Sequence, residues 1–204
     1  MKHFLLVFLF IQFFSVTLFS QSSFRKLSRP EKCWVLTHLI KARKAQAVTQ
    51  KVQLVVDSVR KNGSIGSEEN GGKLDAFKHA YWMASLACKI GPKQALKLGK
   101  AHEKGNYLQF KKQLLEDKSM PDSVSSVMDL RNNAFGVSVA ENNRNSSAIM
   151  LQKLIMDGFA TGQLVVLKKD EEGNYLTCDG QVIHLDEWKG KWNVPKCVVP
   201  SMNH

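Results

Sequence analysis

Apolar residues recur with helical spacing over most of the chain after residue 30. This spacing predicts five helices, which are separated by Gly, Pro and Asn residues that break helices. Their expected bounds are 31–60 with room for one break, 73–90, 93–105 continuing to 116, 122–141 and 146–159.

The pattern changes after Gly158. Three short runs at 163–167, 175–178 and 181–185 are β-type and are separated by the turn signals Glu172-Gly173-Asn174 and Asp179-Gly180. The expected fold class is therefore mainly α: a helical domain of about five helices over residues 21–160, with a small C-terminal β-hairpin appendage over residues 161–204.

The first twenty residues have the layout of a secretory signal peptide. Lys2 gives a basic start, residues 4–14 are apolar apart from Gln12, and small and polar residues follow up to Ser20, near which we expect cleavage. The alternative is an uncleaved N-terminal anchor. No other segment is apolar over enough residues to cross a bilayer. We therefore expect an exported protein, periplasmic or secreted, with no transmembrane segment in the mature chain.

Composition adds a basic character. The chain of 204 residues carries 29 Lys and Arg against 18 Asp and Glu, a formal net charge of +11. This charge suits an anionic substrate or surface, such as lipid headgroups or an acidic polymer, although a solvated basic surface is as common. The lysines are dispersed and no nucleic-acid-binding module is present, which disfavours nucleic acid as a partner. The sequence leaves the oligomeric state open.

The four cysteines allow three complete disulfide pairings. An exported chain permits disulfides, and we favour Cys178 with Cys197, which would fix the C-terminal tail. Cys88 falls on the apolar side of its helix and is expected to be a small buried residue. No spacing resembles a zinc knuckle or a CxxC redox motif.

Two polar residues interrupt the apolar side of the helix predicted over 73–90. Each helical residue turns by about 100 degrees, so Asp75, His79, Trp82 and Leu86 lie on one stripe. Because this stripe includes a large indole and a leucine, Asp75 and His79 are expected to point into the protein. A buried carboxylate needs a partner, so these two side chains should meet other polar groups.

The next helix offers such groups. His102 falls on the same side as Ala95, Leu98 and Ala101, and Glu103 lies at the border of that side. A histidine on an apolar face is often a core residue without chemistry. Two histidines on consecutive helices, one of them a turn after an Asp, make a shared site as good an interpretation as a core role.

A stripe of small and polar residues runs along the helix predicted over 122–141. It contains neither Lys nor Glu, although the chain is rich in lysine, so it is not typical of a solvated face. We expect Asp129, Asn132 and Asn133 to face Asp75, His79 and His102, with Gly136 and Ala140 letting another helix approach closely. The alternative is an Asn/Asp network that only fixes the helix register. The stripe consists of Ser125, Asp129, Asn132, Asn133, Gly136 and Ala140.

Three segments carry a resemblance to a known family: NGGKLDAFKHAYWMASLA at 70–87, ALKLGKAHEKGNY at 95–107 and MDLRNNAFG at 128–136. With fainter matches elsewhere, the mature chain resembles a family of uncharacterised exported bacterial domains of unknown function. The resemblance implies no activity. Lys78 stands where the family often has Arg, and Leu39 where it often has Pro. The family's characteristic polar residues correspond to Asp75, His79, Trp82, His102, Glu103, Asp129, Asn132 and Asn133.

Two hypotheses of different classes follow. In the first, the protein is a hydrolase acting on a phosphate-bearing or anionic envelope substrate, with a His/carboxylate pair in acid–base catalysis or a divalent metal held by His79, His102, Glu103 and Asp129. In the second, it is a non-catalytic envelope or interaction module with a structural polar cluster. Serine hydrolase, nucleotide kinase and zincin readings are not supported, because their motifs are missing. The candidate catalytic residues are His79, Asp75, His102, Glu103, Asp129, Asn132 and Asn133.

Overall fold

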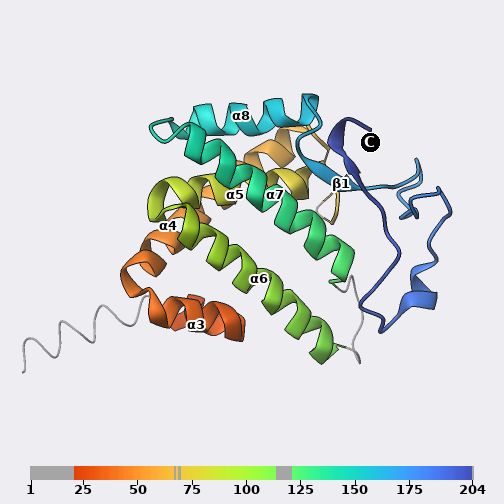
Figure 1. Ribbon diagram of the computed structural model, residues 1–204, viewed down its shortest axis with the longest axis horizontal. Coiled ribbons are helices and arrows are strands. Elements are labelled where there is room, and N and C mark those ends of the chain that lie inside the picture. The colour runs from red at the N-terminus through yellow and green to blue at the C-terminus, as the bar shows by residue number, and fades with distance from the viewer. Residues whose placement is uncertain (1–20, 67, 69, 114–120, 204) are drawn as a thin grey trace, which may run out of the picture.

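The computed structural model describes residues 21–66, 68, 70–113 and 121–203. Its described part is mainly helical, with two short strands near the C-terminus (Figure 1). The expected signal peptide lies outside these residues. The helices are α2 (Gln21–Lys26), α3 (Arg29–Thr37), α4 (Leu39–Asn62), α5 (Lys73–Ile90), α6 (Pro92–Gln113), α7 (Ser123–Asn142) and α8 (Ala148–Ala160).

The described residues thus form seven helices rather than the predicted five. The 31–60 segment does contain a break, at His38, whose backbone leaves the helical region. The other additional helix, α2, lies in a segment expected to be a polar linker. A capping box starts α3, because Ser28 and Glu31 each accept a hydrogen bond from the backbone N–H of the other. Gly63 ends α4 in the left-handed conformation, at φ 64°.

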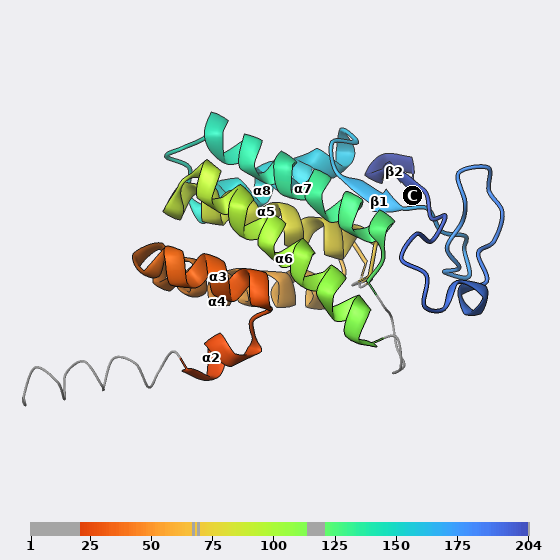
Figure 2. The ribbon, with the colours of Figure 1, turned by 60° about the horizontal axis from the view of Figure 1, so that its bottom comes forward.

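Helix α5 lies at the centre of the fold and packs against α4, α6, α7 and α8 (Figures 1 and 2). Most of its side chains are buried, since it is covered on several sides. It approaches α7 most closely at Gly136, where a Cβ atom would overlap the backbone carbonyl of Ala80. The expected role of Gly136 in close helix packing is therefore confirmed.

The C-terminal strands do not form the predicted hairpin. β1 (Val165–Leu167) pairs in antiparallel fashion with β2 (Val198–Pro200), in the register Val166 to Val199. The runs at 175–178 and 181–185 make only isolated bridges. The buried strand β1 pairs with the returning end of the chain, so the intervening segment is a long excursion. Two short 3-10 helices, η1 (Leu185–Trp188) and η2 (Ser201–Asn203), complete the described elements.

The predicted disulfide between Cys178 and Cys197 is present. It joins the excursion to the residue before β2. A buried ion pair of 2.6 Å between Lys196 Nζ and Asp122 Oδ2 ties the same segment to the start of α7. Cys88 is exposed, so its expected burial is wrong: it lies near the end of α5, where no neighbouring helix covers it.

The part of the chain described here contains no helix that combines the length and the apolar character needed to span a bilayer.

Candidate functional site

Helix α5 places Asp75 and His79 one turn apart, and both side chains are buried, as expected. The Asp75 carboxylate accepts hydrogen bonds from the backbone N–H of Gly71, at 3.0 Å, and from Lys78 Nζ, at 2.7 Å. The Lys78 side chain is 42% exposed, and its ammonium turns back to the carboxylate. These two partners offset the desolvation of Asp75.

Helix α7 brings Asp129 to the same place. His79 Nε2 lies 3.4 Å from Asp129 Oδ1 and 3.7 Å from Asp75 Oδ1. One nitrogen or oxygen atom from each of these three buried residues lies within 4.8 Å of those of the other two. The predicted meeting of Asp75, His79 and Asp129 across the α5–α7 interface is therefore confirmed. We call these three residues the Asp/His/Asp centre.

Helix α6 supplies His102 and Glu103, with a burial opposite to the one expected. The His102 side chain is 38% exposed, whereas Glu103, expected at the border, is 6% exposed. Glu103 faces the interior because α6 packs on both α5 and α7. The ring centroid of His102 lies 6.2 Å from that of His79, and its ring meets Trp82 edge-on at 5.6 Å. His102 thus borders the Asp/His/Asp centre on its more exposed side.

Glu31 is a site residue that the sequence reasoning missed. Its Oε1 lies 3.0 Å from His102 Nδ1, while its Oε2 accepts a hydrogen bond from the backbone N–H of Ser28 at 2.8 Å. The Ser-x-x-Glu spacing indicates a capping box, which accounts for the partner of Glu31 Oε2. It does not predict that Oε1 contacts His102. Glu31 and His102 therefore form a carboxylate–imidazole pair between α3 and α6.

The two consecutive asparagines of α7 have different surroundings, although both are almost completely buried, at 0% and 1% exposure. Asn132 forms two hydrogen bonds with the backbone of Val165: its amide N–H donates to the carbonyl at 2.9 Å, and its carbonyl accepts from the N–H at 3.0 Å. It therefore joins α7 to β1. Asn133 lies against His79 and raises the pKa of that imidazole slightly through a weak hydrogen bond, but neither of its amide atoms meets a described protein group in good hydrogen-bond geometry.

Several buried polar atoms of the cluster have no hydrogen-bond partner among the described residues. Such atoms are uncommon in folded proteins and each calls for an explanation, such as a bound ion. Others, such as Trp34 Nε1 and Gln94 Oε1, lie elsewhere, but five such atoms belong to neighbouring side chains of this cluster. They are His79 Nδ1, Asp129 Oδ1, Glu103 Oε1 and both amide atoms of Asn133.

Burial also sets the charge states at the centre. It lowers the pKa of His79 to about 3, helped by Lys78 and His102 and opposed by Asp75, so the imidazole is neutral at pH 7. Burial, followed by the nearby charges of Asp75 and Glu103, raises the pKa of Asp129 well above its usual value. The centre thus combines a neutral nitrogen donor with carboxylates that repel one another.

The pair at the border behaves differently. Burial lowers the pKa of His102, but the hydrogen bond to Glu31 and the charge of Glu103 outweigh it and leave this pKa raised. Burial raises the pKa of Glu31, yet its hydrogen bonds with His102 and Ser28 leave it lowered. Glu31 therefore favours the protonated imidazole of His102, whereas His79 stays neutral.

The family model for a domain of unknown function (DUF6973) matches residues 32–163. The chain belongs to this family. Comparison with curated proteins and with solved structures gave no match. The matched residues include the Asp/His/Asp centre, His102, Glu103 and both asparagines, but they begin one residue after Glu31 and end before β1.

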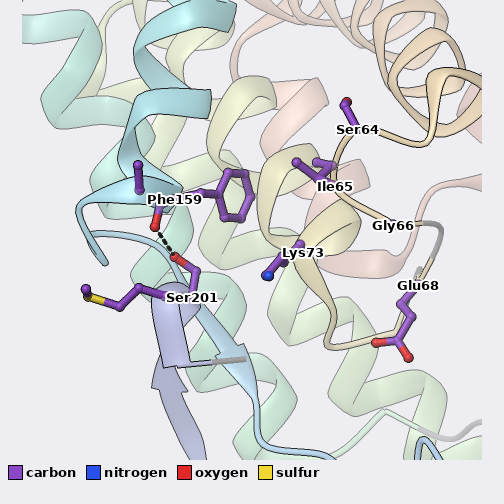
Figure 3. Close-up of a pocket in the computed structure, with 9 residues that line it drawn as sticks. Ser64, Ile65, Gly66, Glu68, Lys73, Phe159 and Ser201 are labelled. Atoms are coloured by element: carbon purple, nitrogen blue, oxygen red, sulfur yellow. Dashed lines mark hydrogen bonds between the residues drawn. The ribbon is translucent and has the colours of Figure 1, made fainter. Parts of the chain in front are cut away.

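A pocket of about 610 Å³ lies elsewhere, where the end of the DUF6973 domain meets the C-terminal segment (Figure 3). Ile65, Lys73, Phe159 and Ser201 are among its lining residues, and Ser201 Oγ donates a hydrogen bond to the Phe159 carbonyl at its edge, at 3.2 Å. No predicted site residue lines it. The predicted residues meet in the interior instead, with His102 as their most exposed member.

The raised pKa of Asp129 predicts a pH-dependent effect of Asp129→Asn on stability. In metal-free protein, the folded state keeps a proton on Asp129 that the unfolded state releases above its ordinary pKa of 3.8. Wild-type stability therefore loses about 1.4 kcal/mol per pH unit from this group as pH rises from 3.8 towards the folded pKa. An asparagine at this position cannot titrate, and all other groups are common to both proteins. The variant should therefore gain stability relative to the wild type as pH rises over this range.

Urea unfolding in the presence of a chelator, repeated from pH 4 upwards, measures this difference. Asp57→Asn is the matched control, because Asp57 is an exposed carboxylate paired with Arg60. A constant difference in unfolding free energy between Asp129→Asn and wild type would contradict the expected proton uptake.

Proposed function

We propose that the Asp/His/Asp centre binds a divalent metal ion and that the protein is a metal-dependent hydrolase. The observation that carries the proposal is the convergence of three buried ligand atoms within 4.8 Å of one another, surrounded by polar atoms without partners. Lys78 pairs with Asp75, but the second buried carboxylate, Asp129, makes no ion pair with a Lys or Arg among the described residues, and a bound cation would offset the cost of burying it.

The donor set suits such an ion. Carboxylate oxygens and a neutral imidazole nitrogen bind zinc, manganese and other first-row divalent ions. His79 has the required neutral form, because burial holds its pKa near 3. A divalent ion in this position would lower the pKa of a bound water and so supply a nucleophile for hydrolysis. Glu103, whose charge acts on Asp129, and Asn133, which lies against His79, are further polar groups that could hold that ion or the substrate.

His102 and Glu31 can serve proton transfer. Glu31 occupies Nδ1 of His102, which leaves Nε2 as the ring nitrogen available to a substrate. A carboxylate-supported imidazole at the exposed border of a site is suited to donate a proton to a leaving group. His102→Gln should therefore lower the rate of hydrolysis while leaving metal affinity close to that of wild type. Comparing metal titration with turnover of the same variant checks this separation.

The substrate class we propose is phosphate-bearing or otherwise anionic, and the place of action is the cell envelope. The net charge of +11 favours the approach of anionic groups. The signal-like N-terminus supports export, and the disulfide between Cys178 and Cys197 is of a kind that persists in oxidising compartments.

A second candidate is a non-catalytic envelope or interaction module whose polar cluster is structural. The observation that favours it is the burial of Asp75, His79 and Asp129, each less than 10% exposed, together with the purely structural hydrogen bonds of Asn132. In this case the cluster would fix how α5, α7 and β1 pack and would need no metal.

Metal titration separates the two candidates. The purified protein is stripped with a chelator and titrated with Zn²⁺ and Mn²⁺ by calorimetry, beside His79→Ala and Asp129→Asn. We expect one metal ion per chain in the wild type. Mutating a residue that only supports a metal ligand typically lowers metal affinity by roughly 10–100-fold. Each of these variants removes a ligand itself, so we expect a larger loss. Asp57→Asn should bind as the wild type does.

Activity against phosphodiesters, phospholipids and peptidoglycan fragments is then compared with and without the bound metal. Metal binding without turnover of any anionic ester would reject the hydrolase. A wild-type protein that binds neither ion would reject the metal site and leave the structural module as the better candidate.

A further inference from the structure

Three large apolar side chains are exposed together at the corner between α3 and α4. Leu36, Leu39 and Ile40 are 63%, 64% and 77% exposed, although they lie within five consecutive positions. Other exposed apolar side chains lie apart from these three, such as Leu54, fourteen residues after Ile40 in α4, and Ile149 in α8. We call Leu36, Leu39 and Ile40 the apolar corner.

The fold holds this corner rigidly outward. His38 stacks on Trp34 with ring centroids 5.0 Å apart, and its Nδ1 lies 2.9 Å from the Trp34 carbonyl oxygen. Trp34 is itself buried in the core. The helix break is therefore anchored from inside, and the apolar side chains on either side of His38 are left facing solvent.

The chain segment that carries the corner is basic. Residues 21–60 contain nine Lys and Arg but only two acidic residues. Both acids are engaged, because Glu31 contacts His102 and Asp57 contacts Arg60. Arg43 and Lys44 lie one helical turn after Leu39 and Ile40 in α4 and are exposed. An anionic partner at this corner would thus meet basic side chains beside the apolar ones.

The corner also lies at one end of the molecule. In Figures 1 and 2 the α3–α4 junction is at the end opposite the C-terminal strands, and it projects beyond the neighbouring helices. A flat surface could contact it without touching the C-terminal segment.

We propose that the apolar corner docks this protein on a bilayer surface rich in anionic phospholipid. Leu36, Leu39 and Ile40 enter the boundary between headgroups and acyl chains, while Arg43 and Lys44 contact the lipid phosphates. Aliphatic side chains beside basic ones are the combination that binds such interfaces. The proposal does not depend on the hydrolase, since it uses no residue of the Asp/His/Asp centre.

Other occupants fit less well. Nucleic acid could contact the basic residues, but aliphatic side chains gain little from a phosphodiester backbone. Leu36, Leu39 and Ile40 are all aliphatic, so the apolar corner offers no aromatic ring on which a base could stack. In a symmetric dimer through this corner, the same basic surface would face its copy, and like charges would repel.

Vesicle co-sedimentation tests the proposal. The experiment uses protein that begins at Gln21, so that the apolar segment before this residue cannot bind lipid. Its thermal unfolding is compared with that of the full chain to verify that it folds. The probes are vesicles of phosphatidylcholine with phosphatidylglycerol and vesicles of phosphatidylcholine alone. The variants are Leu36→Ser/Leu39→Ser/Ile40→Ser and Arg43→Gln/Lys44→Gln, with Leu54→Ser/Ile149→Ser as the matched control for loss of exposed apolar area.

We expect the wild type and the control to bind the anionic vesicles, and the apolar-corner variant to lose at least tenfold in apparent affinity. The charge variant should lose affinity chiefly at low salt. Failure of the wild type to bind anionic vesicles, or unchanged binding by the apolar-corner variant, would overturn the proposal. A wild-type dimer that the apolar-corner variant abolishes would assign the surface to a second copy instead. Unchanged thermal unfolding of the apolar-corner variant would show that its loss of vesicle binding does not result from loss of folding.

Discussion

Replacing Gly136 with alanine is expected to destabilise the protein by about 3 kcal/mol or more, a large part of the stability of an ordinary domain. A Cβ atom at this position would overlap the backbone carbonyl of Ala80, which cannot move without shifting α5. Alanine is otherwise favoured over glycine inside a helix by about 1 kcal/mol, so the effect of the contact opposes and exceeds the propensity gain. Urea unfolding of the variant and the wild type measures the difference.

Gly99→Ala is the matched control. Gly99 also lies inside a helix, but the nearest atoms to its added Cβ would be ends of side chains, Asn133 Nδ2 and Met83 Cε, both at 3.2 Å. Such neighbours can give way, so we expect a change within about 1 kcal/mol. Equal effects of the two substitutions would show that the close approach of α5 and α7 does not limit stability.

The same contact controls the geometry of the candidate site. His79 on α5 lies 3.4 Å from Asp129 on α7, and this distance depends on how closely the two helices pack. A Gly136→Ala protein that remains folded with its helices apart should therefore bind metal less tightly, even though the substitution leaves every candidate ligand in place.

The polar stripe of α7 could be predicted from the sequence because residue type and periodicity agreed. In this lysine-rich chain, one side of the helix carries Asp129, Asn132 and Asn133 but no lysine. We therefore expect other elements to cover that side, and all three residues are buried. A second, apolar stripe of the same helix, which includes Val127, Leu130 and Val137, shows the limit of this reasoning: Val137 is buried, but Val127 and Leu130 are exposed. The periodicity identifies two faces of a helix, and the neighbouring helices decide which one is covered.

The partners of His102 could not be predicted in this way. A helical wheel gives angles within one helix and says nothing about the helix that lies across from it. Glu31 reaches His102 because α3 packs against α6, a contact between residues 71 positions apart in the chain. The exchange in burial between His102 and Glu103 has the same cause.

The C-terminal segment shows the corresponding limit for strands. Local β-type runs and turn signals favoured a hairpin, but β1 pairs with the end of the chain across an excursion of thirty residues. Its neighbours in space are set by the disulfide and by the ion pair of Lys196 with Asp122, which are long-range contacts. The run at 163–167 correctly anticipated β1, but of these long-range contacts only the pairing of the cysteines was anticipated.

Asn132→Leu and Asn133→Leu are expected to have opposite consequences, although the residues are adjacent, identical and equally buried. Leucine has the same number and branching of side-chain heavy atoms as asparagine but is bulkier. Both substitutions add the same volume, so the difference between them reports the loss of polarity. At position 132 the change leaves the N–H and the carbonyl of Val165 without their partners. We expect a loss of about 3 kcal/mol in the free energy of unfolding.

At position 133 the change removes two buried amide atoms that no described protein group satisfies. Since an unpaired buried polar group is itself costly, metal-free Asn133→Leu should be as stable as the wild type or slightly more stable. Its metal affinity or its turnover should fall, because in the wild type those amide atoms are free to contact a bound ion or substrate. Urea unfolding with a chelator and metal titration of both variants test this.

If Asn133→Leu were destabilised as strongly as Asn132→Leu and bound metal normally, both asparagines would be structural. The polar stripe would then fix helix register alone. If only Asn132 proves structural, the fold carries an unsatisfied amide beside His79 at a cost in stability, and a ligand at the Asp/His/Asp centre is the physical reason for that cost.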